Sequence, residues 1–310
     1  MLDRILAIAL NTYREAARAR LLLGVFVLAL ASSAYSLVIA ALSLHNEVRV
    51  VADLGAASLS LYAVIIAVVL GSTSLYRELE LKTIFPILSR PVRRWEYVVA
   101  KYLGALLTVV VFVAIDAAAV FAFLGLEAGQ APWKIGAATG LLLLLLAALL
   151  VRARHLRVFV VVPWGLAAAG ALWLLAEPAG ADRQLVLASA VLAVCEVGIV
   201  AAVATLFASF SSPVLTATFT ALVFVICRSS DTMAHLPRKV FGDGIANGGR
   251  LLAHVIPNLH VYVPARALLL GQSSGTAVWP YVAEAAAHAV LYAIALLAVS
   301  VLAFRKRDFS

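Results

Sequence analysis

Charged residues are scarce in this sequence of 310 residues. They make up 13% of it, whereas a soluble domain carries about 25%. Hydrophobic residues reach 64%, and the mean hydropathy is +1.04. Strands of about ten residues with alternating polarity are also missing, which argues against a membrane β-barrel. The composition therefore predicts an all-α polytopic membrane protein.

Cysteine is scarce too, and several catalytic motifs are absent. Cys195 and Cys227 lie in apolar runs, and neither has the spacing of a metal site. The sequence contains no GxxxxGK(S/T) phosphate loop, no HExxH and no GxSxG. We therefore expect no metal site, no cofactor bound by this chain and no ATP hydrolysis by the chain itself.

Long apolar runs are what the sequence does contain. A helix needs about 20 apolar residues to cross about 30 Å of hydrocarbon. About eight runs reach or approach this length, and together they predict a single transmembrane domain over 1–310: 21–43, 52–75, 98–125, 135–151, 158–176, 185–208, 213–228 and 280–304. If the fourth and fifth runs were re-entrant, six spans would remain, and both termini would still lie on one side.

Positive charge is distributed unevenly around these runs. With the N-terminus inside, 16 of the 24 Lys and Arg residues fall on the inner side. Cytoplasmic loops of membrane proteins accumulate Lys and Arg, and this explains the net charge of +8 without a nucleic-acid partner. We expect a protein of the bacterial inner membrane, surrounded by lipids, with both termini in the cytoplasm.

Several segments are not predicted to span. Apolar residues recur on one helical face of 1–20, so we expect an amphipathic helix in the membrane interface; this face comprises Leu2, Ile5, Leu6, Ala9 and Tyr13. Residues 229–279 form the predicted extracytoplasmic loop. An inner turn precedes the seventh run, where a serine cap and a proline in the first turn are typical of a helix start; it contains Ser209, Ser211, Ser212 and Pro213.

The segment 76–97 is too charged to span and has one apolar face. Apolar residues recur at i, i+3, i+4 and i+7, which predicts a short amphipathic helix; they are Leu81, Ile84, Phe85 and Leu88. Four polar residues fall mostly off this face: Glu78, Glu80, Lys82 and Thr83. Two interpretations stay open, a lipid-surface helix without a partner and a docking element for a cytosolic protein.

The second half of this segment predicts a kinked strap. Pro86 limits the preceding helix, and Pro91 pushes Arg90 toward extended backbone. A new helix begins around Arg93 and Arg94. Their charges oppose the helix dipole, so we expect anionic lipid headgroups or an acidic protein surface to favour them.

Two carboxylates fall inside predicted spans, Asp116 in the third and Glu196 in the sixth. A charge at the bilayer centre costs about 2.5–3.5 kcal/mol on insertion scales, so both should face the bundle interior. A functional role in a substrate path or proton-linked site and a structural role in hydrogen bonding to a neighbouring helix are both open.

The block ELELKTIFPILSRPVRRWEYVVAKYLG (Glu78 to Gly104) resembles the segment after the second span of ABC-2 type transporter permeases. It is most similar to the multicopper-enzyme-maturation subgroup, typified by the permease of the nitrous-oxide-reductase accessory exporter. Four further pieces agree in order: NTYREAARAR, LFASFSSPVLTATFTALVFVICR, IPNLHVY and FRKRDF.

The resemblance implies a mechanism. Such permeases dimerise and bind two cytosolic ABC ATPase subunits, which hold the ATP and Mg²⁺. A coupling helix, here about Glu78–Leu88 with a strap to Arg94, docks on each ATPase and transmits its closure. The inner turn at Ser209, Ser211 and Ser212 would provide a second contact, and a periplasmic accessory protein is an expected partner.

The chain departs from the family pattern in two places. Six spans are usual, so 134–176 is interpreted as an inserted helix pair. Serine often stands where this chain has Arg93, so we expect the serine cap of the next helix to be lost.

The predicted function is the permease subunit of an ATP-driven exporter. The alternatives are a non-transporting anchor for an ATPase, and a membrane enzyme whose catalytic carboxylates, Asp116 and Glu196, meet at one cavity.

Overall fold

The computed structural model describes residues 2–80, 93–153, 155–236, 238–264, 266–269 and 277–305. Within them the chain is helical and forms these elements: α1 (Leu2–Ala16), α2 (Arg20–Leu42), α3 (Glu47–Glu80), α5 (Arg94–Glu127), α6 (Pro132–Arg152), α7 (Arg157–Leu175), η1 (Glu177–Ala179), α8 (Ala181–Ala208), α9 (Pro213–Arg228), α10 (Ser230–Ala234), α11 (Arg238–Val255), η2 (Leu259–Tyr262), α12 (Arg266–Leu269) and α13 (Val278–Arg305).

The predicted class is confirmed. Over the described ranges, seven helices are long and apolar enough to cross a membrane, and α9 is a shorter apolar helix. Each predicted run lies in one of these helices. The largest difference is at α3, which covers Glu47–Glu80 where the hydropathy predicted 52–75, because charged residues at its ends continue the helix beyond the apolar stretch.

Three helices, α3, α5 and α8, form the core. Their apolar windows are the most buried, at 50%, 67% and 72%. Glycines allow the close approach: a Cβ on Gly55 would lie 2.4 Å from Val120 Cγ1, and one on Gly71 would lie 2.3 Å from Ala204 Cβ. Small residues of this kind are typical of helix interfaces in membranes.

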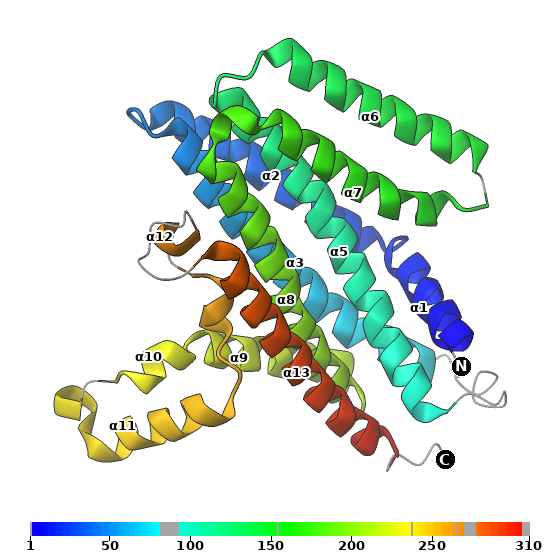
Figure 1. The fold of residues 1–310 in the computed structure, drawn as a ribbon. Coiled ribbons are helices and arrows are strands. Elements are labelled where there is room, and N and C mark those ends of the chain that lie inside the picture. Colours follow the sequence, from blue (N-terminus) through cyan, green and yellow to red (C-terminus); the bar gives the residue numbers. More distant parts are fainter. Residues whose placement is uncertain are drawn as a thin grey trace.

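Both ends of the chain lie at the same end of this bundle (Figure 1). The Tyr97 ring near the start of α5 stacks on the Phe304 ring near the end of α13, with centroids 6.2 Å apart. Ala208, the last residue of α8, and Ile8 of α1 pack in the same cluster. Helix α3 ends and helix α5 begins at this end (Figure 1).

Helix α1 packs along α5 at that end. Ile5, Ala9 and Tyr13 of the predicted apolar face are buried, whereas Leu2 and Leu6 are exposed. The Tyr13 hydroxyl donates to Val158 O (2.9 Å), which ties α1 to the start of α7. Burial raises the pKa of Tyr13 to about 12, so it remains a donor near neutral pH. The location of α1 in the membrane interface stays a prediction.

The predicted pair 134–176 forms two helices on the outside of the bundle. Helix α7 packs on α5, and α6 packs mainly on α7, so that α6 is the outermost helix (Figure 1). Trp164 Nε1 of α7 donates to Leu142 O of α6 (2.8 Å). Only 6% of the apolar window of α6 is buried.

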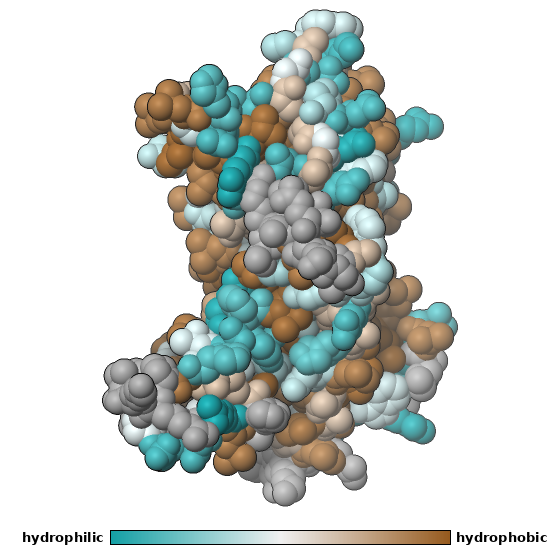
Figure 2. Space-filling view, turned by 60° about the vertical axis from the view of Figure 1, so that its left-hand side comes forward, coloured by the Kyte–Doolittle hydropathy of each residue, from teal (hydrophilic) through white to brown (hydrophobic). Residues whose placement is uncertain are grey.

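The predicted loop 229–279 contains α10, α11, η2 and α12. Within α11 the helix is interrupted at Gly242, whose φ of 76° is a conformation that glycine adopts readily. Helices α10 and α11 project from the side of the bundle opposite α6 (Figure 1). Seen from this side, the surface mixes hydrophilic and hydrophobic residues (Figure 2), unlike a uniformly apolar face that only contacts lipid tails.

Candidate functional site

Most of the predicted docking residues lie outside the described residues. Glu78 belongs to the last turn of α3, and Arg93 and Arg94 stand at the start of α5. The others fall in 81–92: Leu81, Lys82, Thr83, Ile84, Phe85, Leu88 and Arg90. Their role in docking stays a prediction.

The start of α5 keeps one half of a capping box. The backbone N–H of Arg93 donates to Glu96 Oε2 (3.1 Å), and Glu96 is buried. The other half needs a side-chain acceptor at the cap position, which serine has and arginine lacks. The cap is therefore lost only in the half that a serine side chain would supply, because Glu96 still accepts from the backbone N–H of Arg93.

A buried lysine links this helix start to α1. Lys101 is only 3% exposed, and its Nζ lies 3.9 Å from Glu15 Oε2 of α1 and 5.9 Å from the centre of the Tyr97 ring. This contact could not be predicted from the sequence, because Glu15 and Lys101 are distant in the chain and both lie beside apolar runs.

The inner turn holds its three serines in different ways. Ser209 is fully buried, and its hydroxyl donates to Leu206 O of its own helix (2.6 Å). Ser212 occupies the cap position before Pro213, the first residue of α9, but its side chain makes no capping hydrogen bond. Ser211 and Ser212 are partly exposed, so these two are the serines that a partner could reach.

Asp116 lies in a buried hydroxyl cluster between α2, α3 and α5. The Ser33 hydroxyl donates to Asp116 Oδ1 (3.2 Å) and lies 3.1 Å from the Ser58 hydroxyl. Asp116 itself is fully buried, and its second oxygen, Oδ2, has no hydrogen-bond partner. This arrangement joins three helices through neutral donors.

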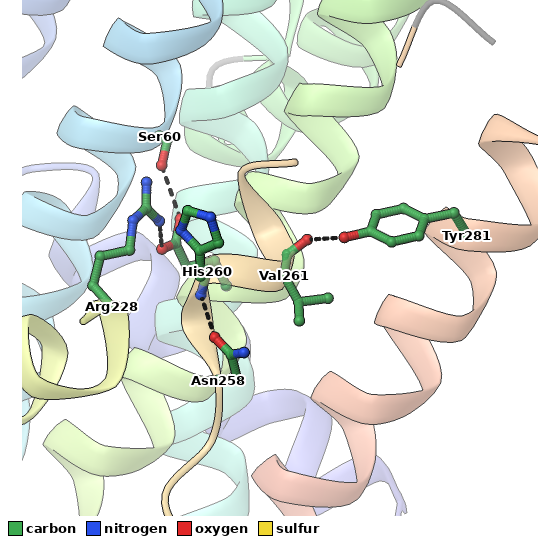
Figure 3. A network of polar contacts seen from close by, with 7 residues as sticks. Ser60, Arg228, Asn258, His260, Val261 and Tyr281 are labelled. Atoms are coloured by element: carbon green, nitrogen blue, oxygen red, sulfur yellow. Dashed lines mark hydrogen bonds and ion pairs between the residues drawn. The ribbon is translucent and has the colours of Figure 1, made fainter. Parts of the chain in front are cut away.

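Glu196 is held by an ion pair. Its carboxylate accepts a hydrogen bond from the Ser60 hydroxyl of α3 (2.8 Å) and pairs with the Arg228 guanidinium, at the end of α9. Ser60 and Arg228 are labelled in Figure 3, where dashed lines mark these contacts. Glu196 is fully buried, and the Arg228 side chain is 30% exposed. A cation in the last turn of α9 also suits the helix dipole.

Sequence reasoning missed Arg228 as the partner of Glu196, because it counted this arginine among the bases of the outer loop. One signal could have found it. A carboxylate in mid-span needs a cation or donors, and Arg228 ends an apolar run of only 16 residues, too short to carry the charge across a bilayer of about 30 Å.

The two buried carboxylates belong to separate networks. Asp116 accepts from Ser33 of α2, which in turn lies beside Ser58 of α3, whereas Glu196 accepts directly from Ser60 of α3. Ser58 and Ser60 are two residues apart, which places them about 200° apart around the helix axis. The two networks therefore reach different sides of α3. Across the described ranges, no group of three or more His, Cys, Asp or Glu side chains could hold a metal ion.

Hydrogen bonds join the IPNLHVY segment to α13. Asn258 Oδ1 accepts from the backbone N–H of His260 (3.0 Å), and the Tyr281 hydroxyl donates to Val261 O (2.6 Å); both contacts are drawn in Figure 3. The Tyr262 hydroxyl lies 3.3 Å from Ala285 O and 3.2 Å from His288 Nδ1. Burial is the main cause that raises the pKa of Tyr262, so its hydroxyl stays protonated. The segment also contacts α8 and α9, beside the Glu196–Arg228 pair.

Comparison with known proteins agrees with this architecture. The model of the ABC-2 family transporter proteins matches residues 6–309. No curated protein sequence gives a significant match. The match covers nearly the whole chain, including the α6–α7 pair and the helices between α9 and α13. This chain belongs to the ABC-2 family of transporter proteins.

Proposed function

We propose that the chain is the permease subunit of an ATP-driven exporter, coupled through residues 76–97 to separate cytosolic ABC ATPase subunits. Membership of the ABC-2 family supports a membrane subunit for transport. The sequence has no phosphate-loop motif, so ATP and Mg²⁺ would bind to the partner. Two copies of the permease would assemble with two ATPases.

The observation that carries this proposal is how the helices flanking 81–93 enter the core. Both α3 and α5 have 34 residues, which corresponds to about 51 Å of helix, whereas about 20 residues cross the hydrocarbon. Both then pack against α8. A force applied to residues 81–93, which connect α3 to α5, would thus reach the centre of the bundle through two continuous helices.

The network at the start of α5 supports transmission to a further element. Glu96 caps α5, and Lys101 one turn further on pairs with Glu15 of α1. A displacement of the α5 start would therefore move α1 as well. We infer an orientation with both termini in the cytoplasm of a bacterial inner membrane, because Arg14, Arg18, Arg152 and Arg157 gather at this end of the helices.

The proposed class of cargo rests only on the resemblance of residues 78–104 to the multicopper-enzyme-maturation permeases. That resemblance favours a transporter that serves maturation of a periplasmic metalloenzyme, with a periplasmic accessory protein as receiver. Sulfur species for cofactor assembly, lipids, peptides and polysaccharides are the cargo classes to compare.

The docking proposal is tested by ATPase capture. The tagged chain is purified from its native membranes, and vanadate-sensitive ATP hydrolysis and the co-purified ATPase subunit are measured. Phe85→Asp and Leu88→Asp place a charge on the apolar face of 81–88, so each should lower capture by at least tenfold.

The matched control is Leu44→Asp. Leu44 is 87% exposed in the turn between α2 and α3, at the other end of the bundle, so capture should not change. Undiminished capture by both Phe85→Asp and Leu88→Asp would refute docking through this face. Capture without stimulation of hydrolysis by any of the four cargo classes would instead indicate a non-transporting anchor.

A further inference from the structure

The ion pair between Glu196 and Arg228 joins three helices at one point. Glu196 belongs to α8, its hydrogen-bond donor Ser60 to α3, and Arg228 is the last residue of α9. The pair therefore fixes α9 at the end remote from its turn with α8 (Figure 3).

The rest of α9 is packed lightly. Several of its large side chains face outward, since Val214, Leu222 and Val225 are each more than half exposed. The residues that it buries are small: Thr216, Thr220 and Cys227. The Thr216 hydroxyl is buried without a hydrogen-bond partner. Small side chains bury little apolar surface, so packing alone holds α9 weakly.

A crevice runs between α8 and α9. Its lining includes Val200 and Val203 of α8, Val223, Phe224 and Cys227 of α9, and Leu259 of η2. Cys227 directly precedes Arg228 in the sequence, so the crevice reaches the end of the helix that the ion pair restrains.

We propose that the Glu196–Arg228 pair is a latch that holds α9 against α3 and α8, and that opening the pair swings α9 outward and widens the crevice. The inference rests on the proposed function, because ATPase closure would supply the work for this step. Separating the pair leaves Glu196 buried with only the Ser60 hydroxyl as a partner. A buried charge that loses its counter-ion is costly, so the closed position is favoured until work is supplied. The hydrogen bonds between η2 and α13 hold η2 in place while α9 moves.

Cys227 is a native reporter for this movement. It is 1% exposed, next to Arg228 and in the crevice wall. The chain has one other cysteine, Cys195, so Cys195→Ala leaves a single thiol. The experiment measures the rate at which N-ethylmaleimide labels Cys227 in the full chain in membranes, by mass spectrometry.

Glu196→Gln keeps the shape of the side chain but removes the charge that pairs with Arg228. We expect Cys227 to be labelled at least tenfold faster in this variant. The double variant Glu196→Arg with Arg228→Glu should restore slow labelling. Glu284→Gln, on the exposed Glu284 of α13, is the matched control and should leave the rate unchanged.

A second reporter separates local opening from unfolding. Ala63 of α3 is fully buried, so Ala63→Cys in a chain with Cys195→Ala and Cys227→Ala reports on the core. Fast labelling at Cys227 with slow labelling at position 63 supports the latch. Fast labelling at both positions would overturn it, because the pair would then stabilise the whole bundle, and so would an unchanged rate at Cys227. The measurement needs no ATPase, so its failure would leave the docking proposal intact.

Discussion

At the scale of the residue, the two buried carboxylates have different surroundings. Glu196 faces a guanidinium, whereas Asp116 accepts from the hydroxyl of Ser33 and keeps one oxygen without a hydrogen-bond partner. A buried charge needs a partner of opposite sign or several hydrogen bonds. The pairing of Glu196 therefore depends on its negative charge. The contact of Asp116 depends on the shape of its side chain and on an oxygen that accepts from Ser33.

Asp116→Asn should accordingly preserve the free energy of unfolding or raise it slightly. The amide keeps an acceptor for Ser33, and in the described part of the chain no cation pairs with Asp116. Asp116→Ala removes the acceptor and should cost about 1–3 kcal/mol. Thermal unfolding of the purified protein in detergent measures both. If Asp116→Asn kept its stability but lost transport, the carboxylate would have a role in the cycle.

Tyr281→Phe should loosen the IPNLHVY segment without disturbing α13. It removes the hydrogen bond to Val261 O (2.6 Å), and the net loss for one such bond is about 0.5–1.5 kcal/mol. Amide hydrogen exchange at 259–262 should rise severalfold. Tyr292→Phe is the control, on the same helix; equal effects of the two substitutions would contradict the assignment.

At the scale of the element, α1 is held to α5 by a close backbone approach. A Cβ on Gly104 would lie 2.5 Å from Ala9 O and 2.6 Å from Thr12 Cβ. Contacts this short cannot be accommodated, so any side chain at 104 must push α1 away. Only glycine allows the contact that brings Glu15 near Lys101.

Gly104→Leu should therefore release α1 while the core stays folded. We expect amide exchange within Ile5–Ala16 to accelerate at least tenfold, with little change in α8. Gly136→Leu is the matched control, because a Cβ on Gly136 would meet nothing within 4 Å. Unchanged exchange in α1 would show that packing on Gly104 does not hold this helix.

At the scale of the whole molecule, the helices alternate in direction, and the turns gather at two ends. One end holds the α2–α3, α5–α6 and α7–α8 connections (Figure 1), which contain Asn46, Gln130 and Glu177. The end where α1 begins and α13 ends holds the α6–α7 and α8–α9 connections, which contain Leu156 and Phe210. The excess of Lys and Arg at the second end favours its placement in the cytoplasm.

A single cysteine at each of these five positions, in a chain with Cys195→Ala and Cys227→Ala, tests this orientation. A membrane-impermeant maleimide added to cells with a permeable outer membrane should label positions 46, 130 and 177 and leave positions 156 and 210 unlabelled. Permeabilised cells should be labelled at all five. The reverse pattern would contradict cytoplasmic termini.

The sequence predicted the helices well and their contacts poorly. Runs such as 98–125 and 185–208 are readable because hydropathy is a local property. The partners of Glu196 and Lys101 are not, because Arg228 and Glu15 come from other helices and only packing brings them close. Hydropathy also cannot distinguish α5, mostly buried by protein, from α6, which is mostly exposed, since lipid tails and protein interiors are similarly apolar.

The pairing of the buried Glu196 with Arg228 also bears on biogenesis. Inserting a helix with a lone arginine or aspartate at its centre costs about 2.5–3.5 kcal/mol. Helix α9 has only 16 residues to offset the charge of Arg228. Helices α8 and α9 are joined by the short turn 209–212, so the two charges can neutralise each other within one hairpin. We therefore expect α8 and α9 to leave the translocon together, with the ion pair already formed before the later helices arrive.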